Sequence, residues 1–229
     1  MAGLKRAALD LVFPRWCLGC GREGGYICGT CRLALPAIDP PVCVRCGRPF
    51  SSGMVCSSCP VGEMYIDGIR SPFLFDGVVR RAIHELKYNN LRDLASTLAG
   101  MLHEYITQSP VPGEVLAPVP LHPRRLRERG YNQSALVAGE LGRLMGMPVV
   151  EECLVRSGQA PPQVRSAGAE ERRRNVAAAF ACRDHRLAGK KVILIDDVST
   201  SGATLNACAR VLKSVGADSV WGLVIALEK

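Results

Sequence analysis

Two adjacent aspartates, Asp196 and Asp197, precede a short turn of small and hydroxyl-bearing residues. The turn reads Ser199, Thr200, Ser201, Gly202, Ala203 and Thr204. Such a turn before a helix offers backbone N–H groups and hydroxyl donors to a phosphate. Like charges beside an anion cost free energy, so the carboxylates make sense if the ligand also presents hydroxyl groups or a metal. A ribose 5-phosphate does so: the turn would hold the 5-phosphate, and the carboxylates would accept hydrogen bonds from the 2- and 3-hydroxyls.

The elements on either side of this turn fit a phosphate site. Val192 to Ile195 is a short apolar run rich in β-branched residues, which predicts a buried parallel strand. After the turn, apolar residues recur at helical spacing until Gly216, which is placed to end the helix. An ordinary strand–turn–helix connection capped by Ser or Thr is the alternative. A P-loop does not fit, because no Lys follows the glycine.

The stretch resembles the phosphoribosyl pyrophosphate (PRPP) motif of the type I phosphoribosyltransferases, in which two acidic residues precede a T-T-G-x-T-like turn. The resemblance implies that Asp196 and Asp197 hold the ribose and serve catalysis, that the turn from Ser199 to Thr204 holds the 5-phosphate, and that Mg²⁺ accompanies PRPP. Ser201 stands where the motif usually has Thr, and the change keeps the hydroxyl. Thr200 stands where purine-salvage members place an acid near the base, which argues against hypoxanthine or guanine as the acceptor.

A second strand–turn–helix segment begins with the apolar run Val115 to Val119 and makes a parallel βαβ sheet the expected fold. Its turn carries His122 and four arginines, and its helix contains Ala135 to Met145. In type I phosphoribosyltransferases this turn holds the pyrophosphate, so the resemblance implies contacts at Leu121, His122 and Arg129. A solvated basic loop, or arginines that face nucleic acid, are the alternatives. The four arginines are Arg124, Arg125, Arg127 and Arg129.

Helical periodicity from Val78 ends in Leu86-Lys87-Tyr88. Lys87 is a candidate PRPP contact, and a cation that complements the helix dipole is the simpler interpretation. The other elements expected here are a connector over Pro60 to Arg70, a strand at Phe73 to Phe75, a helix at about Leu91 to Thr107, and a last strand at Trp221 to Leu227.

Eight of the eleven cysteines form four C-x-x-C pairs near the start of the chain. Each pair can place two thiolates on one metal, so eight cysteines suit two structural zinc ions. The short gaps between them favour a first zinc ion shared by the first and second C-x-x-C pairs and a second zinc ion shared by the third and fourth. A cross-braced arrangement of the pairs is the alternative. Gly21 and Gly47 follow a knuckle's second cysteine, where a tight turn needs a positive φ. The ligands are Cys17, Cys20, Cys28, Cys31, Cys43, Cys46, Cys56 and Cys59.

Disulfides, an iron–sulfur cluster and redox-active pairs are the alternatives to zinc. Disulfides conflict with a cytoplasmic location, and the C-x2-C-x2-C spacing of bacterial ferredoxins is absent. A zinc module with few apolar residues would draw its folding energy from the metal. Its role is either structural or the binding of nucleic acid or protein. Cys153, Cys182 and Cys208 lack such spacing and are expected to be small core residues.

Composition bounds these interpretations. The 229 residues suit one medium domain and a small one, and 48% hydrophobic content supports a sizeable core. No apolar run reaches the length of a membrane span. Met1 to Pro14 lacks the features of a signal peptide and is expected to form a short amphipathic helix of a cytoplasmic protein. A net charge of +8 favours a polyanionic ligand or partner, and both a pyrophosphorylated sugar and nucleic acid qualify.

Several motifs in order resemble the ComF family of competence-associated, phosphoribosyltransferase-like proteins over nearly the whole chain. The resemblance implies a double zinc ribbon at residues 14–62 and a type I phosphoribosyltransferase domain at 63–229, with a mostly parallel sheet flanked by helices. The motifs are the cysteine knuckles, Leu86-Lys87-Tyr88, Pro118-Val119-Pro120-Leu121-His122, Arg129-Gly130-Tyr131-Asn132-Gln133, Arg172-x-x-Asn175 and the Asp196-Asp197 stretch.

Two functions follow from that resemblance. The first is a PRPP-binding transferase that moves ribosyl phosphate onto an acceptor the sequence does not identify, linked to DNA uptake and natural competence. The second is a non-catalytic factor that handles single-stranded DNA, with other competence proteins as partners. The expected mobile segment, Leu154 to Phe180, bears on this choice. Family members read R-x-(R/K)-x-T-x-x-Q there, and Gly158 and Ala160 replace the second basic residue and the Thr. These departures concern catalysis and not ligand binding.

Overall fold

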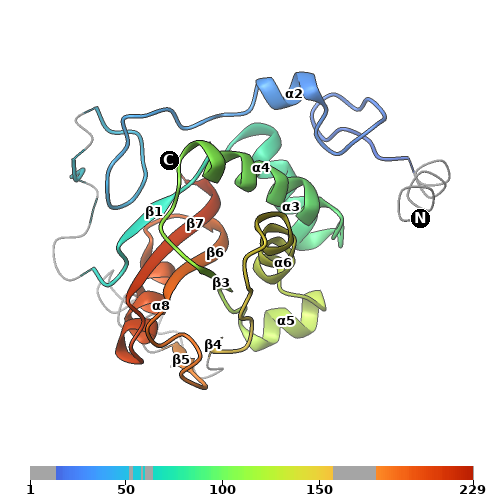
Figure 1. Cartoon of the computed structure of the whole chain (residues 1–229). Coiled ribbons are helices and arrows are strands. Elements are labelled where there is room, and N and C mark those ends of the chain that lie inside the picture. Colours follow the sequence, from blue (N-terminus) through green and yellow to red (C-terminus); the bar gives the residue numbers. More distant parts are fainter. Residues whose placement is uncertain (1–13, 52–53, 58, 60–63, 157–178, 229) are drawn as a thin grey trace, which may run out of the picture.

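The computed structural model of the chain has a parallel β-sheet at its centre (Figure 1). It describes residues 14–51, 54–57, 59, 64–156 and 179–228. The strand order is β1-β7-β6-β3, and every pairing between these strands is parallel. The expected parallel sheet is therefore confirmed. The strands are β1 (Gly68–Arg70), β3 (Val115–Pro118), β6 (Lys191–Ser199) and β7 (Ser219–Leu227).

Helices cover both faces of this sheet, as Figure 1 shows. Ile193 and Ile195 of β6 pack with α3 (Gly77–Tyr88), α4 (Leu94–Gln108) and α6 (Gln133–Met145). Val192 and Leu194 face the other way and pack with α8 (Ala203–Ser214). Because successive side chains of a strand point to opposite faces, a strand covered on both sides reads as one continuous apolar run.

The edge of the sheet beside β7 differs from the expectation. Gly68–Arg70 lies within the predicted connector but forms β1, which pairs with Trp221 to Leu223. This strand has only three residues, which is too few for an alternating pattern of apolar residues to be recognised in the sequence. Gly68 is required there because a Cβ would lie 2.4 Å from the Trp221 ring. The predicted strand at Phe73 forms as β2 (Phe73–Leu74), which pairs farther along β7.

The arginine-rich turn contains a helix that periodicity does not predict, α5 (Pro123–Arg129). The Nδ1 atom of His122 accepts a hydrogen bond from the Arg124 N–H at 3.2 Å, and Pro123 occupies the first turn. Gly130 ends the helix with φ 79°. Pro at the start and Gly after the end are the local signals that could have predicted it.

The remaining elements lie close to expectation. The helix from Val78 begins at Gly77, where the Asp76 side chain accepts a hydrogen bond from the first N–H. α4 starts three residues later than predicted. Leu154 and Phe180 open two strands of a small antiparallel pair. The pair consists of β4 (Leu154–Arg156) and β5 (Phe180–Cys182). Cys153 and Cys208 are buried as predicted, and Cys182 is half-buried.

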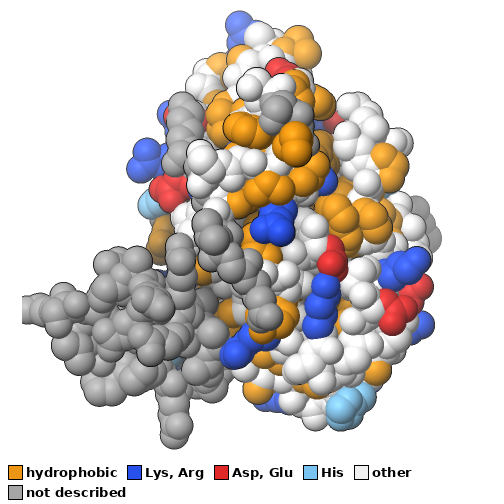
Figure 2. Space-filling view, turned by 90° about the vertical axis from the view of Figure 1, so that its left-hand side faces the viewer, with side chains coloured by type: hydrophobic (Ala, Val, Ile, Leu, Met, Phe, Trp, Pro, Cys, Tyr) orange, Lys and Arg blue, Asp and Glu red, His pale blue; other side chains and the backbone are white. Residues whose placement is uncertain are grey.

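The cysteine-rich module lies along the outside of this domain and contains the short helix α2 (Gly29–Leu33). Its own buried cluster consists of Cys43, Cys56 and Cys59, with Phe50 packed against them. Val44, Met54 and Val55 are exposed. Figure 2, which views the molecule from the left-hand side of Figure 1, shows exposed hydrophobic side chains with Lys and Arg among them. Because the module buries so little apolar surface, it needs another source of stability.

Two regions discussed from the sequence fall on residues whose structure is not described. The amphipathic helix expected near the start lies on residues 1–13, and the central part of the expected mobile segment lies on residues 157–178. Among the helices that are described, none combines the length and the apolar character that a membrane crossing requires.

Candidate functional site

The acid pair lies at the carboxyl end of β6, where open parallel sheets bind ligands. The strand continues through both aspartates, so their side chains leave it on opposite sides. Asp197 turns toward α3 and α6 and is only 4% exposed, whereas Asp196 is half-buried. One sequence pair therefore provides two carboxylates in different environments.

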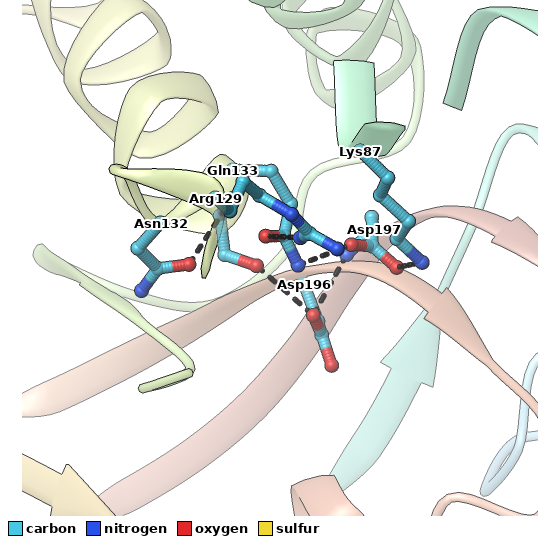
Figure 3. Close-up of polar contacts among 7 residues, drawn as sticks. Lys87, Arg129, Asn132, Gln133, Asp196 and Asp197 are labelled. Atoms are coloured by element: carbon cyan, nitrogen blue, oxygen red, sulfur yellow. Dashed lines mark hydrogen bonds and ion pairs between the residues drawn. The ribbon is translucent and has the colours of Figure 1, made fainter. Parts of the chain in front are cut away.

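Asp197 is held by two cationic or polar side chains from distant parts of the chain (Figure 3). The Nζ atom of Lys87, at the end of α3, lies 2.5 Å from its Oδ1 atom. The Nε2 atom of Gln133, at the start of α6, donates to its Oδ2 atom at 2.6 Å. The structure thus brings Lys87 to the acid pair. The lysine therefore does more than complement the dipole of α3.

Asp196 is held on one oxygen. Its Oδ1 atom accepts hydrogen bonds from the Ser134 hydroxyl at 3.0 Å and from the Asp197 backbone N–H at 2.9 Å. Burial, followed by the neighbouring charge of Asp197, raises the pKa of Asp196 to about 7. Its second oxygen lies away from this network in Figure 3. A carboxylate with one oxygen fixed and the other open is suited to accept a ligand hydroxyl.

Gln133 and Ser134 were missed as site residues by the sequence analysis. Both are buried polar residues in the first turn of α6, at 5% and 1% exposure. The Asn132 side chain caps this helix by accepting a hydrogen bond from the Ser134 N–H at 3.1 Å. Arg129 in turn donates to the Gln133 side-chain oxygen. Three polar residues at the start of an otherwise apolar-faced helix are the signal that could have identified them.

Tyr131 explains how Lys87 reaches the acids. Its hydroxyl donates a hydrogen bond to the carbonyl of Leu86, the residue before Lys87. Its ring lies under the Arg92 guanidinium, 4.4 Å from ring centroid to Cζ. Burial raises the pKa of Tyr131, so the phenol stays a donor. The end of α3 is therefore fixed to the turn that opens α6.

The predicted phosphate turn is intact and compact. A pocket of about 50 Å³ is lined by Asp196 and by the residues from Val198 to Leu205, which include all six predicted turn residues. Gly202 takes φ 73° as the N-cap of α8, and a Cβ there would lie 2.9 Å from the Ile69 Cδ1 atom. The twelve-residue helix α8 thus directs its N-terminus at this pocket, a geometry that favours an anion.

The arginines after β3 do not act as one set. Arg124 pairs with Glu128 at 2.8 Å. Arg129 turns toward Gln133 and lies 5.5 Å from the centroid of the Tyr88 ring. Leu121 lines a separate cavity of about 650 Å³ between α5, α6 and β4, and His122 serves as the cap of α5. Only Arg129 among these contacts the network around the acids.

The eight cysteines form two four-thiol clusters, and the groups follow sequence order. The first cluster is Cys17, Cys20, Cys28 and Cys31, and the second cluster is Cys43, Cys46, Cys56 and Cys59. Sulfur pairs within them lie 3.5 to 3.7 Å apart. Zn–S bonds of about 2.3 Å in a tetrahedron place sulfurs about 3.8 Å apart, whereas a disulfide needs about 2.05 Å. The clusters therefore suit zinc, and the pairing is sequential.

The thiols of each cluster differ in acidity in a way that also suits a cation. Burial opposes ionisation of Cys17 and Cys43, but hydrogen bonds from backbone N–H groups outweigh it and lower the pKa of each to about 6. Hydrogen bonds that the Cys31 thiol donates to Cys17 and Cys28 raise the pKa of Cys31 to about 12. Without a metal, one thiolate suppresses the ionisation of its neighbours; a zinc ion removes that conflict.

Comparisons with known proteins agree with both halves of this structure. Residues 8–60 match the double zinc ribbon domain, and residues 134–228 match the phosphoribosyl transferase domain. Competence protein F of Haemophilus influenzae is 29% identical, covering 87% of this chain and 90% of its own. Competence protein ComFC of Bacillus subtilis is 28% identical, covering 83% and 79%. The DNA utilization protein YhgH of Escherichia coli K12 is 28% identical, covering 85% and 87%.

These likenesses extend over most of the chain, and the two domains occur in the order that the sequence motifs predict. The chain thus combines a double zinc ribbon domain with a phosphoribosyl transferase domain, and it is similar over most of its length to competence and DNA utilization proteins, as its resemblance to the ComF family implies.

Proposed function

We propose that this protein binds the ribose 5-phosphate group of a ligand, and that the complete ligand is PRPP together with Mg²⁺. We propose further that the protein uses this binding site in the handling of incoming DNA. The observation that carries the proposal is the phosphate turn at the N-terminus of α8, directly beside an aspartate with one open carboxylate oxygen. The competence and DNA utilization proteins among its relatives support the biological setting.

Each part of the site has a distinct task in this proposal. The turn from Ser199 to Thr204 binds the 5-phosphate through backbone N–H groups and hydroxyls. Asp196 accepts hydrogen bonds from the ribose hydroxyls. Asp197 holds Lys87, and this cation lies where it lowers the cost of placing an anion beside two carboxylates. Leu121 and His122 are retained as backbone contacts for the pyrophosphate.

The proposed chemistry is transfer of the ribosyl phosphate. The bond between C1 of the ribose and the pyrophosphate oxygen breaks, the leaving group takes the electron pair, and an acceptor attacks C1. Mg²⁺ bound with PRPP would neutralise charge on the departing pyrophosphate. The protein would supply the acid pair, which stabilises the positive charge that develops on the sugar, and Arg129 at the pyrophosphate side.

Isothermal titration calorimetry tests the binding proposal. We expect ribose 5-phosphate to bind the protein without metal, and PRPP to bind more tightly when Mg²⁺ is present. Asp196→Asn should weaken both. A wild-type protein that binds neither ligand would refute the proposal. Pyrophosphate release with PRPP, Mg²⁺ and a panel of nucleophiles then separates a transferase from a binding protein.

A DNA-handling role without turnover is the second candidate. The favouring observation is the exposed Tyr88 ring, which lies 4.7 Å from the His84 ring and beneath Arg129. Exposed aromatic rings beside arginines suit stacking with unpaired bases. A titration with single-stranded DNA at two salt concentrations, with and without saturating PRPP and Mg²⁺, distinguishes the two. We expect weak, salt-sensitive DNA binding that PRPP does not abolish.

We also propose that the boundary between the two domains lies near residue 62, and that the protein is located in the cytoplasm. Zinc-bound thiolates, rather than disulfides, are typical of a reducing compartment. Treatment of the purified protein with a thiol-alkylating reagent, before and after metal removal, would report whether the eight cysteines are metal-bound.

A further inference from the structure

The two cysteine clusters begin with the same local motif. Each has a knuckle in which a C-x-x-C pair is followed by Gly and Arg, so Arg22 and Arg48 are equivalent positions. The Cys17 N–H donates to the Arg22 carbonyl, and the Cys43 N–H donates to the Arg48 carbonyl, each at 2.8 Å. The glycines also correspond, with φ of 71° for Gly21 and 73° for Gly47. The knuckles are therefore internal repeats with matched backbones.

Their surroundings differ. The first cluster lies against the helices α3 and α4, through the ion pair of Arg32 with Glu104 and a hydrogen bond from Arg81 to the Leu18 carbonyl. Arg22 is exposed there. The second cluster lies against the phosphate turn, and the Arg48 guanidinium donates a hydrogen bond to the Thr200 carbonyl. The first knuckle thus provides a natural control for the second.

The second cluster shares a recess with the phosphate turn. Cys46, Arg48 and Cys59 line it from one side, and Ser199 to Gly202 line it from the other. β1 fixes the distance between them. The Ile69 N–H donates to the Arg45 carbonyl at 2.7 Å, and a Cβ on Gly47 would lie 2.4 Å from the Ile69 carbonyl oxygen. Little freedom remains for the knuckle to move relative to the turn.

The contact with Thr200 has a consequence for the next N–H group. In a planar trans peptide the C=O and the following N–H point in opposite directions. If Arg48 holds the Thr200 carbonyl toward the zinc cluster, the Ser201 N–H must point away from it. Among the described residues this N–H has no acceptor. Because Thr200 and Ser201 are exposed, their shared peptide has little other packing to keep this orientation.

We propose that Arg48 is a positioning residue of the phosphate site. Held by the zinc-bound second knuckle, it orients the Thr200–Ser201 peptide so that the Ser201 N–H is ready for the 5-phosphate. Zinc in the second cluster and phosphate in the turn are then energetically linked, whereas zinc in the first cluster is not. The inference rests on the proposed binding of ribose 5-phosphate and extends it to the zinc module.

The first test is calorimetry with ribose 5-phosphate. Arg48→Ala should weaken binding about tenfold, the change expected from losing one hydrogen bond that involves a charged group. Arg48→Lys keeps a donor and should recover part of the affinity. Arg22→Ala, the matched change in the first knuckle, should leave the affinity unchanged. Zinc content and thermal stability of all three variants are measured in parallel, so that a folding defect is recognised.

The second test measures zinc release, because a ligand that binds the zinc-bound form of the second knuckle stabilises that form. A chromogenic zinc chelator should remove zinc from the wild-type protein in two phases, and saturating ribose 5-phosphate should slow one of them. In Arg48→Ala the ligand should slow neither phase. Equal affinity of wild type and Arg48→Ala, or no effect of the ligand on zinc release, would overturn the inference and leave the proposed function intact. Failure of wild type to bind ribose 5-phosphate and PRPP would overturn both.

Discussion

The zinc module and the α/β domain are stabilised by different physical terms. The module buries four cysteines and few apolar side chains, and its own buried cluster consists of three of those cysteines. The domain buries two apolar layers, one on each face of the sheet. Within the domain, the polar site is held by a buried ion pair and by hydrogen bonds at the ends of β6 and α6. Perturbations should therefore separate the two regions, and also separate the polar site from its apolar support.

Removal of zinc should give the largest effect. Zinc binding contributes about 10 kcal/mol or more per structural site, and the module has no apolar core to replace it. We expect chelation to unfold residues around both clusters while β6, β7 and α8 stay folded. Hydrogen exchange measured by mass spectrometry, before and after chelation, would locate the change. Loss of protection in the central strands would show that the two regions are not separable.

The zinc content of the purified protein tests the same assignment of the two clusters. Elemental analysis of the purified protein should give two zinc ions per chain, and Cys17→Ser should lower this number by about one. Iron in place of zinc, or a folded module with eight reactive thiols, would contradict the assignment of the clusters.

The second largest expected effect is the loss of stability when Asp197 is replaced. Asp197→Asn leaves Lys87 mostly buried without a carboxylate, and breaking a buried ion pair by removal of one partner costs about 3 kcal/mol. Urea denaturation measures this loss. Glu114→Gln is the control, because Glu114 pairs with Lys190 at 3.3 Å with both side chains about half exposed. That change should cost less than about 0.5 kcal/mol. Equal costs would show that Asp197 does not stabilise the site.

The sequence predicted the parts of this molecule whose signals are local. The run from Val192 to Ile195, the turn after it and the helix beyond are contiguous, and their order was enough to predict the strand, the pocket and α8. The spacing of the cysteines similarly predicted the two clusters and their sequential pairing. In these segments the residues that act together are neighbours in the chain.

The missed features depend on tertiary packing. Lys87 meets Asp197 at the end of α3, where the Tyr131 hydroxyl bonds the Leu86 carbonyl, and no spacing within α3 encodes that contact. Gln133 looks like an ordinary polar residue at a helix start until β6 is placed beside it. Strand β1 has three residues, and its pairing is decided by the Trp221 ring against Gly68. Contacts of this kind require the arrangement of the elements.

The smallest effect concerns Asp196 and depends on pH. The folded protein raises the pKa of this carboxyl from 3.8 to about 7, first through burial and then through Asp197. Between these values the folded state binds more protons than the unfolded state, so the free energy of unfolding falls as pH rises. Because Asn cannot ionise, Asp196→Asn should remove the part of this fall in the free energy of unfolding that Asp196 causes.

We therefore expect Asp196→Asn to be more stable than wild type at pH 8 by about 1 kcal/mol, roughly the worth of one pKa unit for a group that keeps contact with water. The difference should shrink toward pH 4, because the folded carboxyl is then protonated and the unfolded carboxyl begins to take up its proton as pH approaches 3.8. Urea denaturation at pH 4.5, 6 and 8 measures it. Ser134→Ala removes only one hydrogen bond to Asp196 and serves as the comparison. A gain in stability that accompanies lost ribose 5-phosphate affinity would show that the site keeps Asp196 for its ligand and at a cost to the fold. A difference that is the same at all three pH values would contradict this assignment of the raised pKa.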